Sequence, residues 1–92
     1  MVAARRLRFA VIGVGDFGPQ LLQYINEVAD VAAICDPSPA SRSRCREQTG
    51  LNLAEFEEHE TLLDRVPLDA VAIASPNFTH KEITIAAARR GR

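Results

Sequence analysis

Residues 11–18 of the chain read Val-Ile-Gly-Val-Gly-Asp-Phe-Gly, and they follow directly on an apolar run that begins at residue 7. A near-continuous apolar run of this length is typical of a strand that is buried on both faces of a parallel sheet. Behind the glycines, apolar residues recur at helical spacing and predict an amphipathic helix from about residue 17 to residue 29. The stretch therefore predicts a strand, a glycine-rich turn and a helix in direct succession.

The same alternation continues to the end of the chain. Ser38 is a good N-cap, Pro39 suits the first helical position, and Gly50 stands where the residue after a helix belongs. The elements expected after the first helix are a strand over residues 31–35, a helix between Ser38 and Gly50, a short strand near 51–56, a small helix over 57–63, a strand over 70–74 and a helix over about 80–90, capped by Asn77 or Thr79.

Alternating strands and helices with short connections imply right-handed crossovers and a parallel sheet. We predict an α/β fold of three layers over residues 1–92, with a Rossmann-like parallel sheet of strand order 3-2-1-4. The order reverses between the first and fourth strands, so a ligand is expected above Gly13.

Composition excludes several classes of protein. The chain has 92 residues, 47% of them hydrophobic, and a formal net charge of -1. One small domain fits this size, and the balanced charge gives no reason to expect nucleic acid or a membrane surface as a partner. The longest apolar runs are strand-sized, so we expect no membrane span and a cytoplasmic location.

Cysteines and histidines give no sign of a metal site. Cys35 lies in an apolar strand and Cys45 on the following helix, so both are expected to be reduced packing residues. No CxxC pair occurs, and His59 and His80 lie far apart in the sequence. We expect His59 to be a surface residue.

The glycine-rich loop has the spacing of a dinucleotide-binding turn. In that arrangement Gly13 allows the tight turn, Gly15 lets the backbone approach a pyrophosphate, and Gly18 permits close packing of the helix on the strand. The amino end of the helix favours the phosphates through its N–H groups and dipole.

An acidic residue, Asp36, ends the next apolar run and is placed to accept hydrogen bonds from the adenosine ribose. Its carboxylate would repel a 2′-phosphate, so NAD is expected and NADP is disfavoured. Arg42 and Arg44 either offset this repulsion in part or are solvated arginines on the helix surface. Asp16 is unfavourable to a phosphate unless its side chain points outward.

Three segments together resemble the Gfo/Idh/MocA oxidoreductases. They are residues 11–18, residues 34–39 (Ile-Cys-Asp-Pro-Ser-Pro) and residues 69–80 (Asp-Ala-Val-Ala-Ile-Ala-Ser-Pro-Asn-Phe-Thr-His), in family order and spacing. The Pro-Asn-x-x-His turn makes the match specific, because Rossmann domains in general lack it. The resemblance implies an N-terminal Rossmann domain and NAD(P)-dependent oxidation or reduction of sugars, inositols and related polyols.

The resemblance also implies site residues by position. Ser75, Pro76, Asn77 and His80 would line the cofactor on the side of the fourth strand, although His80 has a second interpretation as a helix residue that satisfies local backbone groups. The full set of expected cofactor-binding residues is Gly13, Gly15, Asp16, Phe17, Gly18, Asp36, Ser75, Pro76, Asn77 and His80.

Two features of the family do not occur within these 92 residues: a strand ending in Glu-Lys-Pro, whose lysine acts near the substrate, and the larger second domain. Lys81 matches no catalytic position, so no catalytic residue is assigned. We expect the dinucleotide-binding part of an oxidoreductase, incomplete relative to the family and not competent for turnover by itself. The alternative is a non-catalytic nucleotide-binding or oligomerising module. In either case we expect a homo-oligomer through the exposed sheet edge or the last helix.

Overall fold

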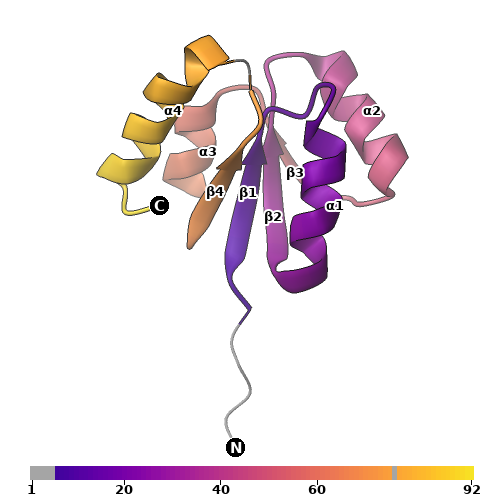
Figure 1. Cartoon of the computed structure of the whole chain (residues 1–92), viewed down its shortest axis with the longest axis horizontal. Helices are drawn as coiled ribbons and strands as arrows, with labels where there is room; N and C mark the ends of the chain where they lie inside the picture. The colour runs from indigo at the N-terminus through magenta and orange to yellow at the C-terminus, as the bar shows by residue number, and fades with distance from the viewer. Residues whose placement is uncertain (1–5, 76) are drawn as a thin grey trace, which may run out of the picture.

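The computed structural model describes residues 6–75 and 77–92, and the side chains of Asn77 and Phe78 are not included in that description. Strands and helices alternate along these residues, as the sequence predicts (Figure 1). The elements are β1 (Arg8–Ile12), α1 (Gly18–Val28), β2 (Asp30–Cys35), α2 (Pro39–Thr49), β3 (Ala54–Phe56), α3 (His59–Arg65), β4 (Ala70–Ile73) and α4 (Asn77–Arg89).

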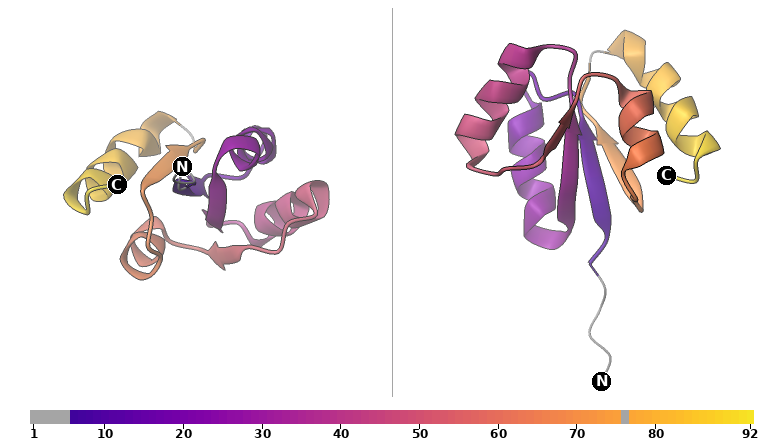
Figure 2. Two further views of the ribbon diagram at one scale, coloured as in Figure 1. Left: turned by 90° about the horizontal axis from the view of Figure 1, so that it is seen from below. Right: turned by 180° about the vertical axis from the view of Figure 1, so that it is seen from behind.

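The strands form one parallel sheet of order β3-β2-β1-β4, which confirms the predicted topology. Helices α1 and α2 cover one face of the sheet, and α3 and α4 cover the other (Figure 2). The central strand β1 pairs on both sides, with Phe9 opposite Val31 of β2 and Ala70 of β4. All four carboxyl ends therefore meet at one edge of the sheet.

Successive residues of β1 enter two separate cores, because side chains alternate between the faces of a strand. On one face, Ala10 and Ile12 pack with the α3 leucines and with Ile83 of α4. On the other face, Val11 packs with Leu22 of α1 and Cys45 of α2. Both cysteines are buried and unpaired, which confirms that they are reduced packing residues.

The last helix begins earlier than expected. Helix α4 starts at Asn77, so Asn77 is its first residue and Thr79 lies inside its first turn, and the prediction that one of these two residues caps the helix is wrong. The physical reason is local, since the Thr79 hydroxyl donates to Oγ of Ser75 at 2.7 Å and so draws the first turn against the end of the strand. Pro76 lies outside the described residues.

In the part of the chain that the structure describes, no helix combines the length and the apolar character that crossing a membrane requires.

Candidate functional site

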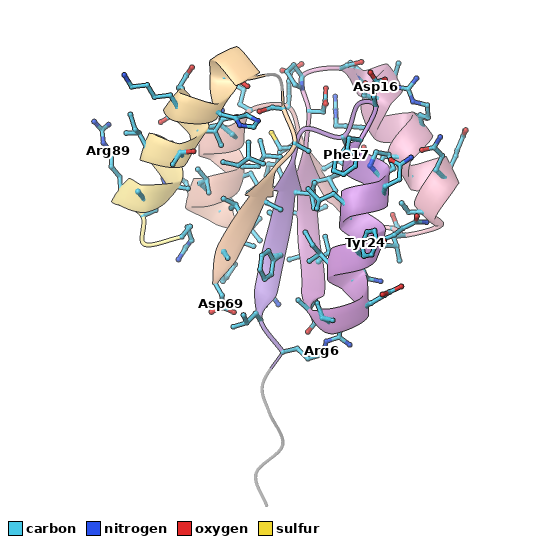
Figure 3. All side chains as sticks on the ribbon, viewed as in Figure 1. Arg6, Asp16, Phe17, Tyr24, Asp69 and Arg89 are labelled. Carbon is cyan, nitrogen blue, oxygen red and sulfur yellow. The ribbon has the colours of Figure 1, made fainter. Side chains whose placement is uncertain are left out.

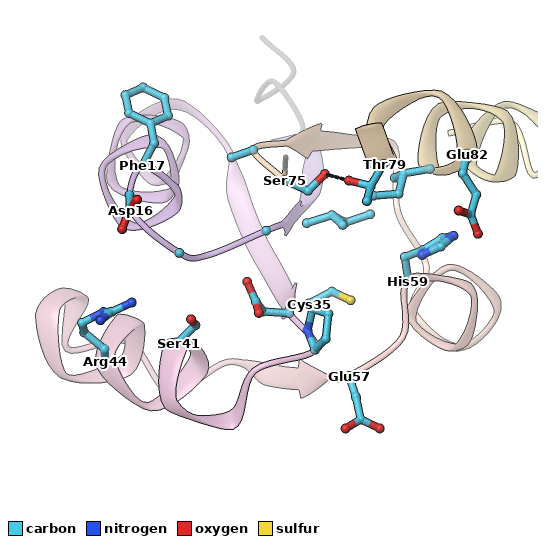
Figure 4. Close-up of a pocket in the computed structure, with 17 residues that line it drawn as sticks. Asp16, Phe17, Cys35, Ser41, Arg44, Glu57, His59, Ser75, Thr79 and Glu82 are labelled. Carbon is cyan, nitrogen blue, oxygen red and sulfur yellow. Dashed lines mark hydrogen bonds between the residues drawn. The ribbon is translucent and has the colours of Figure 1, made fainter. Parts of the chain in front are cut away.

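A cavity of about 710 Å³ opens at the carboxyl ends of the strands, between the glycine loop, the start of α2 and the helices α3 and α4 (Figure 4). The topology explains this position, because the connections leave the β1 and β4 ends toward opposite faces of the sheet and so leave a crevice between them. The lining residues are Ile12, Gly13, Gly15, Asp16, Phe17, Cys35, Asp36, Pro37, Ser41, Arg44, Glu57, His59, Ala74, Ser75, Thr79, Glu82 and Ile83.

Gly13 is required by the fold at the point where β1 passes into the loop. Its φ is +94°, and a Cβ there would lie 2.5 Å from the backbone nitrogen of Ser75. Its own N–H donates to the carbonyl oxygen of Cys35 at 2.8 Å. The loop therefore presses against the end of β4, which leaves no room for a side chain.

Gly18 and Gly15 differ in what surrounds them. A Cβ on Gly18 would collide with the carbonyl oxygen of Gly13, so glycine is needed for α1 to pack on the loop. A Cβ on Gly15 would meet no protein atom within 4 Å, and Gly15 lines the cavity. The fold itself gives no reason for a glycine at this position, whereas a ligand packed against the loop would.

The amino end of α1 borders the cavity without a side-chain cap. Phe17 is the N-cap residue and offers no side-chain oxygen, and the first turn contains no acidic residue. Uncapped N–H groups at a helix start attract anions. Phe17 and Asp16 are both exposed, and Figure 3 shows Asp16 at the top of the loop and Phe17 beside the start of α1. Asp16 also lines the cavity, and Figure 4 shows its carboxylate on the side of Arg44, away from Ser75.

Two backbone N–H groups hold the carboxylate of Asp36 on the cavity wall. Oδ2 accepts from Val14 at 3.0 Å, and Oδ1 accepts from Ser38 at 2.8 Å. The Asp36 N–H in turn donates to the carbonyl oxygen of Phe56 at 3.0 Å, which ties the ends of β2 and β3 together. Each carboxylate oxygen keeps a second lone-pair direction for a ligand hydroxyl.

The side of β4 carries Ser75, Thr79 and His80. Ser75 and Thr79 line the cavity. The imidazole of His80 is absent from that lining, and its Nε2 lies 2.6 Å from the carbonyl oxygen of Ser75. This contact agrees with the interpretation of His80 as a residue that satisfies local backbone groups, while its contact with a cofactor stays a prediction. The Asn77 side chain lies outside the described part of the chain, as does Pro76.

Helix α2 contributes Ser41 and Arg44, which the sequence analysis did not single out as lining residues. They are one helical turn apart, so helical periodicity alone places them on one face. The sequence left open whether Arg42 and Arg44 act near the cofactor or are solvated on the helix surface, and the structure places the two arginines differently. Arg44 is exposed on the cavity wall, whereas Arg42 does not line the cavity and its Nε is buried without a hydrogen-bond partner among the described residues.

His59 is not a surface residue, and that prediction is wrong. The side chain is half-buried, it lines the cavity, and its Nε2 is shut from water without a hydrogen-bond partner in the described residues. The reason is that β3 is parallel to the other strands, so the start of α3 lies at the same edge as the glycine loop. Glu57 and Glu82 line the cavity on this side too.

Cys35 is the only cysteine among the residues that line the cavity. Burial, followed by the negative charge of Asp36, raises the pKa of its thiol to about 12, although the positive charge of Arg42 opposes the shift. The thiol is therefore protonated at neutral pH and unreactive. Within residues 6–75 and 77–92, no group of three or more His, Cys, Asp and Glu side chains is arranged to hold a metal ion.

Comparison with known proteins bears on this site. Residues 7–92 match the GFO_IDH_MocA family model, described as an oxidoreductase family with an NAD-binding Rossmann fold. The 2,7-anhydro-N-acetylneuraminate hydratase of Escherichia coli is 31% identical over 85 residues, which are 90% of this chain and 22% of that protein. The chain thus spans less than a quarter of the length of the curated relatives it matches.

Solved structures of dehydrogenases contain a domain with a similar fold. The WlbA dehydrogenase of Bordetella pertussis, crystallised with NADH and UDP-GlcNAcA, has a TM-score of 0.84 at 26% identity, over 96% of this chain and 27% of that one. The scyllo-inositol dehydrogenase of Lactobacillus casei, crystallised with NAD(H) and scyllo-inositol, also has a TM-score of 0.84, at 22% identity over 96% of this chain and 26% of that one. The second likeness supports the fold alone.

Proposed function

Because this chain belongs to the Gfo/Idh/MocA oxidoreductase family, with its NAD-binding Rossmann domain at residues 7–92, we propose that the cavity holds the adenosine half of NAD(H). The observation that carries the proposal is the difference among the three glycines. Packing requires Gly13 and Gly18, whereas Gly15 faces open space on the cavity wall. A ligand pressed against the loop accounts for a glycine there.

The proposed contacts follow from the geometry. The pyrophosphate lies against the loop of Gly13, Gly15 and Gly18, beside the uncapped start of α1, with Asp16 and Phe17 at its rim. The ribose hydroxyls donate to Asp36. We also propose cofactor contacts from Ser75, Pro76, Asn77 and His80, on the side of β4.

NAD rather than NADP is the proposed cofactor. The Asp36 carboxylate is held by Val14 and Ser38, so it cannot turn aside from a 2′-phosphate without losing two hydrogen bonds. Arg44 is exposed at the rim and thus offers a screened positive charge only. Repulsion from the fixed carboxylate therefore outweighs it.

We propose an oxidoreductase acting on a sugar, an inositol or a related polyol as the activity that this domain serves. The hydratase named above is named for a sugar derivative, and the WlbA dehydrogenase was crystallised with one. Bound NAD(H) supplies the hydride acceptor or donor. The residues of this chain bind and orient it, and the cavity provides no lysine for acid–base chemistry, since Lys81 is not in its lining. Oxidation of a polyol or sugar by residues 1–92 alone, followed by NADH absorbance, would contradict this division of roles.

The test is a titration of the protein with NADH, followed by fluorescence or calorimetry. Gly15→Val fills the space beside the loop and is expected to weaken binding about tenfold or more. Ala88→Val is the matched control, because it adds a similar volume on the exposed side of α4 away from the cavity. Unfolding without cofactor checks that both variants are folded. Failure of the wild-type protein to bind NADH overturns the proposal, and unchanged binding by Gly15→Val overturns the placement of the pyrophosphate.

A second candidate, an oligomerising module, is supported by β4. In the described sheet this strand pairs with β1 alone, and all its residues are half-buried. An unpaired strand edge is a template for another chain. We propose self-association through this edge or through α4, where Ile85 is 41% exposed.

A cytoplasmic location is also part of the proposal. Cys35 and Cys45 are both buried, unpaired thiols, which suits a reducing compartment.

A further inference from the structure

His59 lines the cavity on the side away from Asp16 and Phe17 (Figure 4), and one polar atom of its ring has no hydrogen-bond partner in the described residues. It is Nε2 of His59, which is shut from water and makes no hydrogen bond within the described residues. An orphaned polar atom inside a protein costs folding free energy, and native structures rarely keep one without a reason. The His59 side chain lines the cavity, so its unpartnered nitrogen belongs to a ring that a ligand in the cavity would contact.

The surroundings of His59 suit a flat aromatic base. Ile12, Pro37 and Ile83 add apolar surface to the lining of the same cavity. Glu82 of α4 lines the same cavity as His59 and also shares two neighbouring surface hollows with it. Figure 4 shows the carboxylate of Glu82 beside the imidazole of His59. The cavity therefore combines apolar surface with the imidazole of His59 and the carboxylate of Glu82, and Glu57 lines it on the same side.

We infer that His59 and Glu82 bind the hydrogen-bonding edge of the adenine base, an inference that rests on the proposed function. With its proton on Nε2, His59 donates to a ring nitrogen of the base, and the carboxylate of Glu82 accepts from the exocyclic amino group. Adenine presents one acceptor and one donor on this edge. Hypoxanthine presents the reverse, a carbonyl oxygen and a ring N–H, so its carbonyl oxygen faces the carboxylate.

The experiment compares the affinity of the protein for NAD⁺ with its affinity for nicotinamide hypoxanthine dinucleotide, which differs only at this edge. The wild-type protein is expected to prefer NAD⁺ about tenfold. His59→Phe keeps a flat ring and is expected to weaken NAD⁺ binding about three- to tenfold. Glu82→Gln is expected to remove the preference, because an amide both donates and accepts.

Glu47→Gln is the matched control, since it removes one carboxylate from an exposed side chain of α2 that lines neither the cavity nor the two hollows. It is expected to keep the wild-type preference. Glu82 is exposed, so Glu82→Gln tests the inference even where His59→Phe fails to fold.

The outcomes separate the two proposals. Binding of NAD⁺ without a preference over the hypoxanthine analogue overturns the role of His59 and Glu82 and leaves the proposed function standing. A preference that both variants retain also overturns that role. A wild-type protein that binds neither dinucleotide overturns both proposals.

Discussion

Gly13, Gly15 and Gly18 lie within one short loop, yet the absence of a side chain matters for a different reason at each. Gly13 has a positive φ, and a side chain there would meet the backbone that follows β4; a side chain on Gly18 would meet the carbonyl oxygen of Gly13, and one on Gly15 would meet open space. Identical residues are therefore separable by experiment into those needed for the fold and the one proposed to be needed for the ligand.

Gly13→Ala is expected to lower the free energy of unfolding by about 2 kcal/mol or more, because it combines an unfavourable backbone conformation with a steric conflict at Ser75. Gly15→Ala is the matched control and is expected to stay within about 0.5 kcal/mol of the wild type. Urea denaturation measures both. Equal stabilities for the two variants would show that the loop does not press on β4.

Asp36→Asn is expected to reduce the preference for NAD over NADP about tenfold, because it removes the negative charge that faces the 2′ position. Dissociation constants for both cofactors give the ratio. Asp30→Asn serves as control, since Asp30 is at the opposite end of β2. A ratio that Asp36→Asn leaves unchanged would exclude Asp36 from the ribose site.

At the scale of elements, one arginine joins the two helices that form the far wall of the cavity. Arg90 follows α4, and its Nε donates to Asp64 of α3 at 2.7 Å, while Nη2 lies 3.5 Å from Glu60. Nη1 donates to the carbonyl oxygen of Ala86 at 2.8 Å. These contacts fix α4 against α3 in a region where both helices are otherwise solvent-exposed on their outer faces.

Arg90→Ala is expected to lower the Tm by a small amount that depends on pH. The hydrogen bond from Arg90 lowers the pKa of Asp64 below its ordinary value. Because this pKa is lower in the folded than in the unfolded state, the charged Asp64 stabilises the folded state at pH values above the ordinary pKa of about 3.9. The stabilisation is lost as the pH falls through the lowered, folded-state pKa. The difference between wild type and Arg90→Ala is therefore expected to shrink in acid, and also in high salt, since the pair is exposed.

Thermal unfolding at neutral and acidic pH measures this difference, with Arg89→Ala as the control at the neighbouring exposed position. A difference that grows in acid would contradict the assigned ion pair.

Element order was predictable from the sequence, but some element boundaries were not. Apolar periodicity and turn residues specify that α4 follows β4, because both signals are local. The start of α4 at Asn77 depends instead on contacts of Thr79 and His80 with Ser75. Such contacts exist only once the turn has formed.

At the scale of the whole molecule, the open edge of β4 predicts self-association. Light scattering over a range of concentrations is expected to give a mass above that of one chain, because exposed backbone groups on an edge strand pair readily. A monomeric mass at the highest concentration would contradict an interface at this edge or on α4.

The sequence by itself determined the parallel sheet, its strand order, the glycine loop and the position of Asp36 at the end of β2, since these depend on residue spacing and turn chemistry along the chain. Tertiary structure alone decided that His59 and Glu82 share a cavity wall with that loop, that Arg44 rather than Arg42 reaches it, and that His80 contacts Ser75. The physical reason is that side-chain direction and burial depend on packing between elements distant in sequence, which periodicity does not encode.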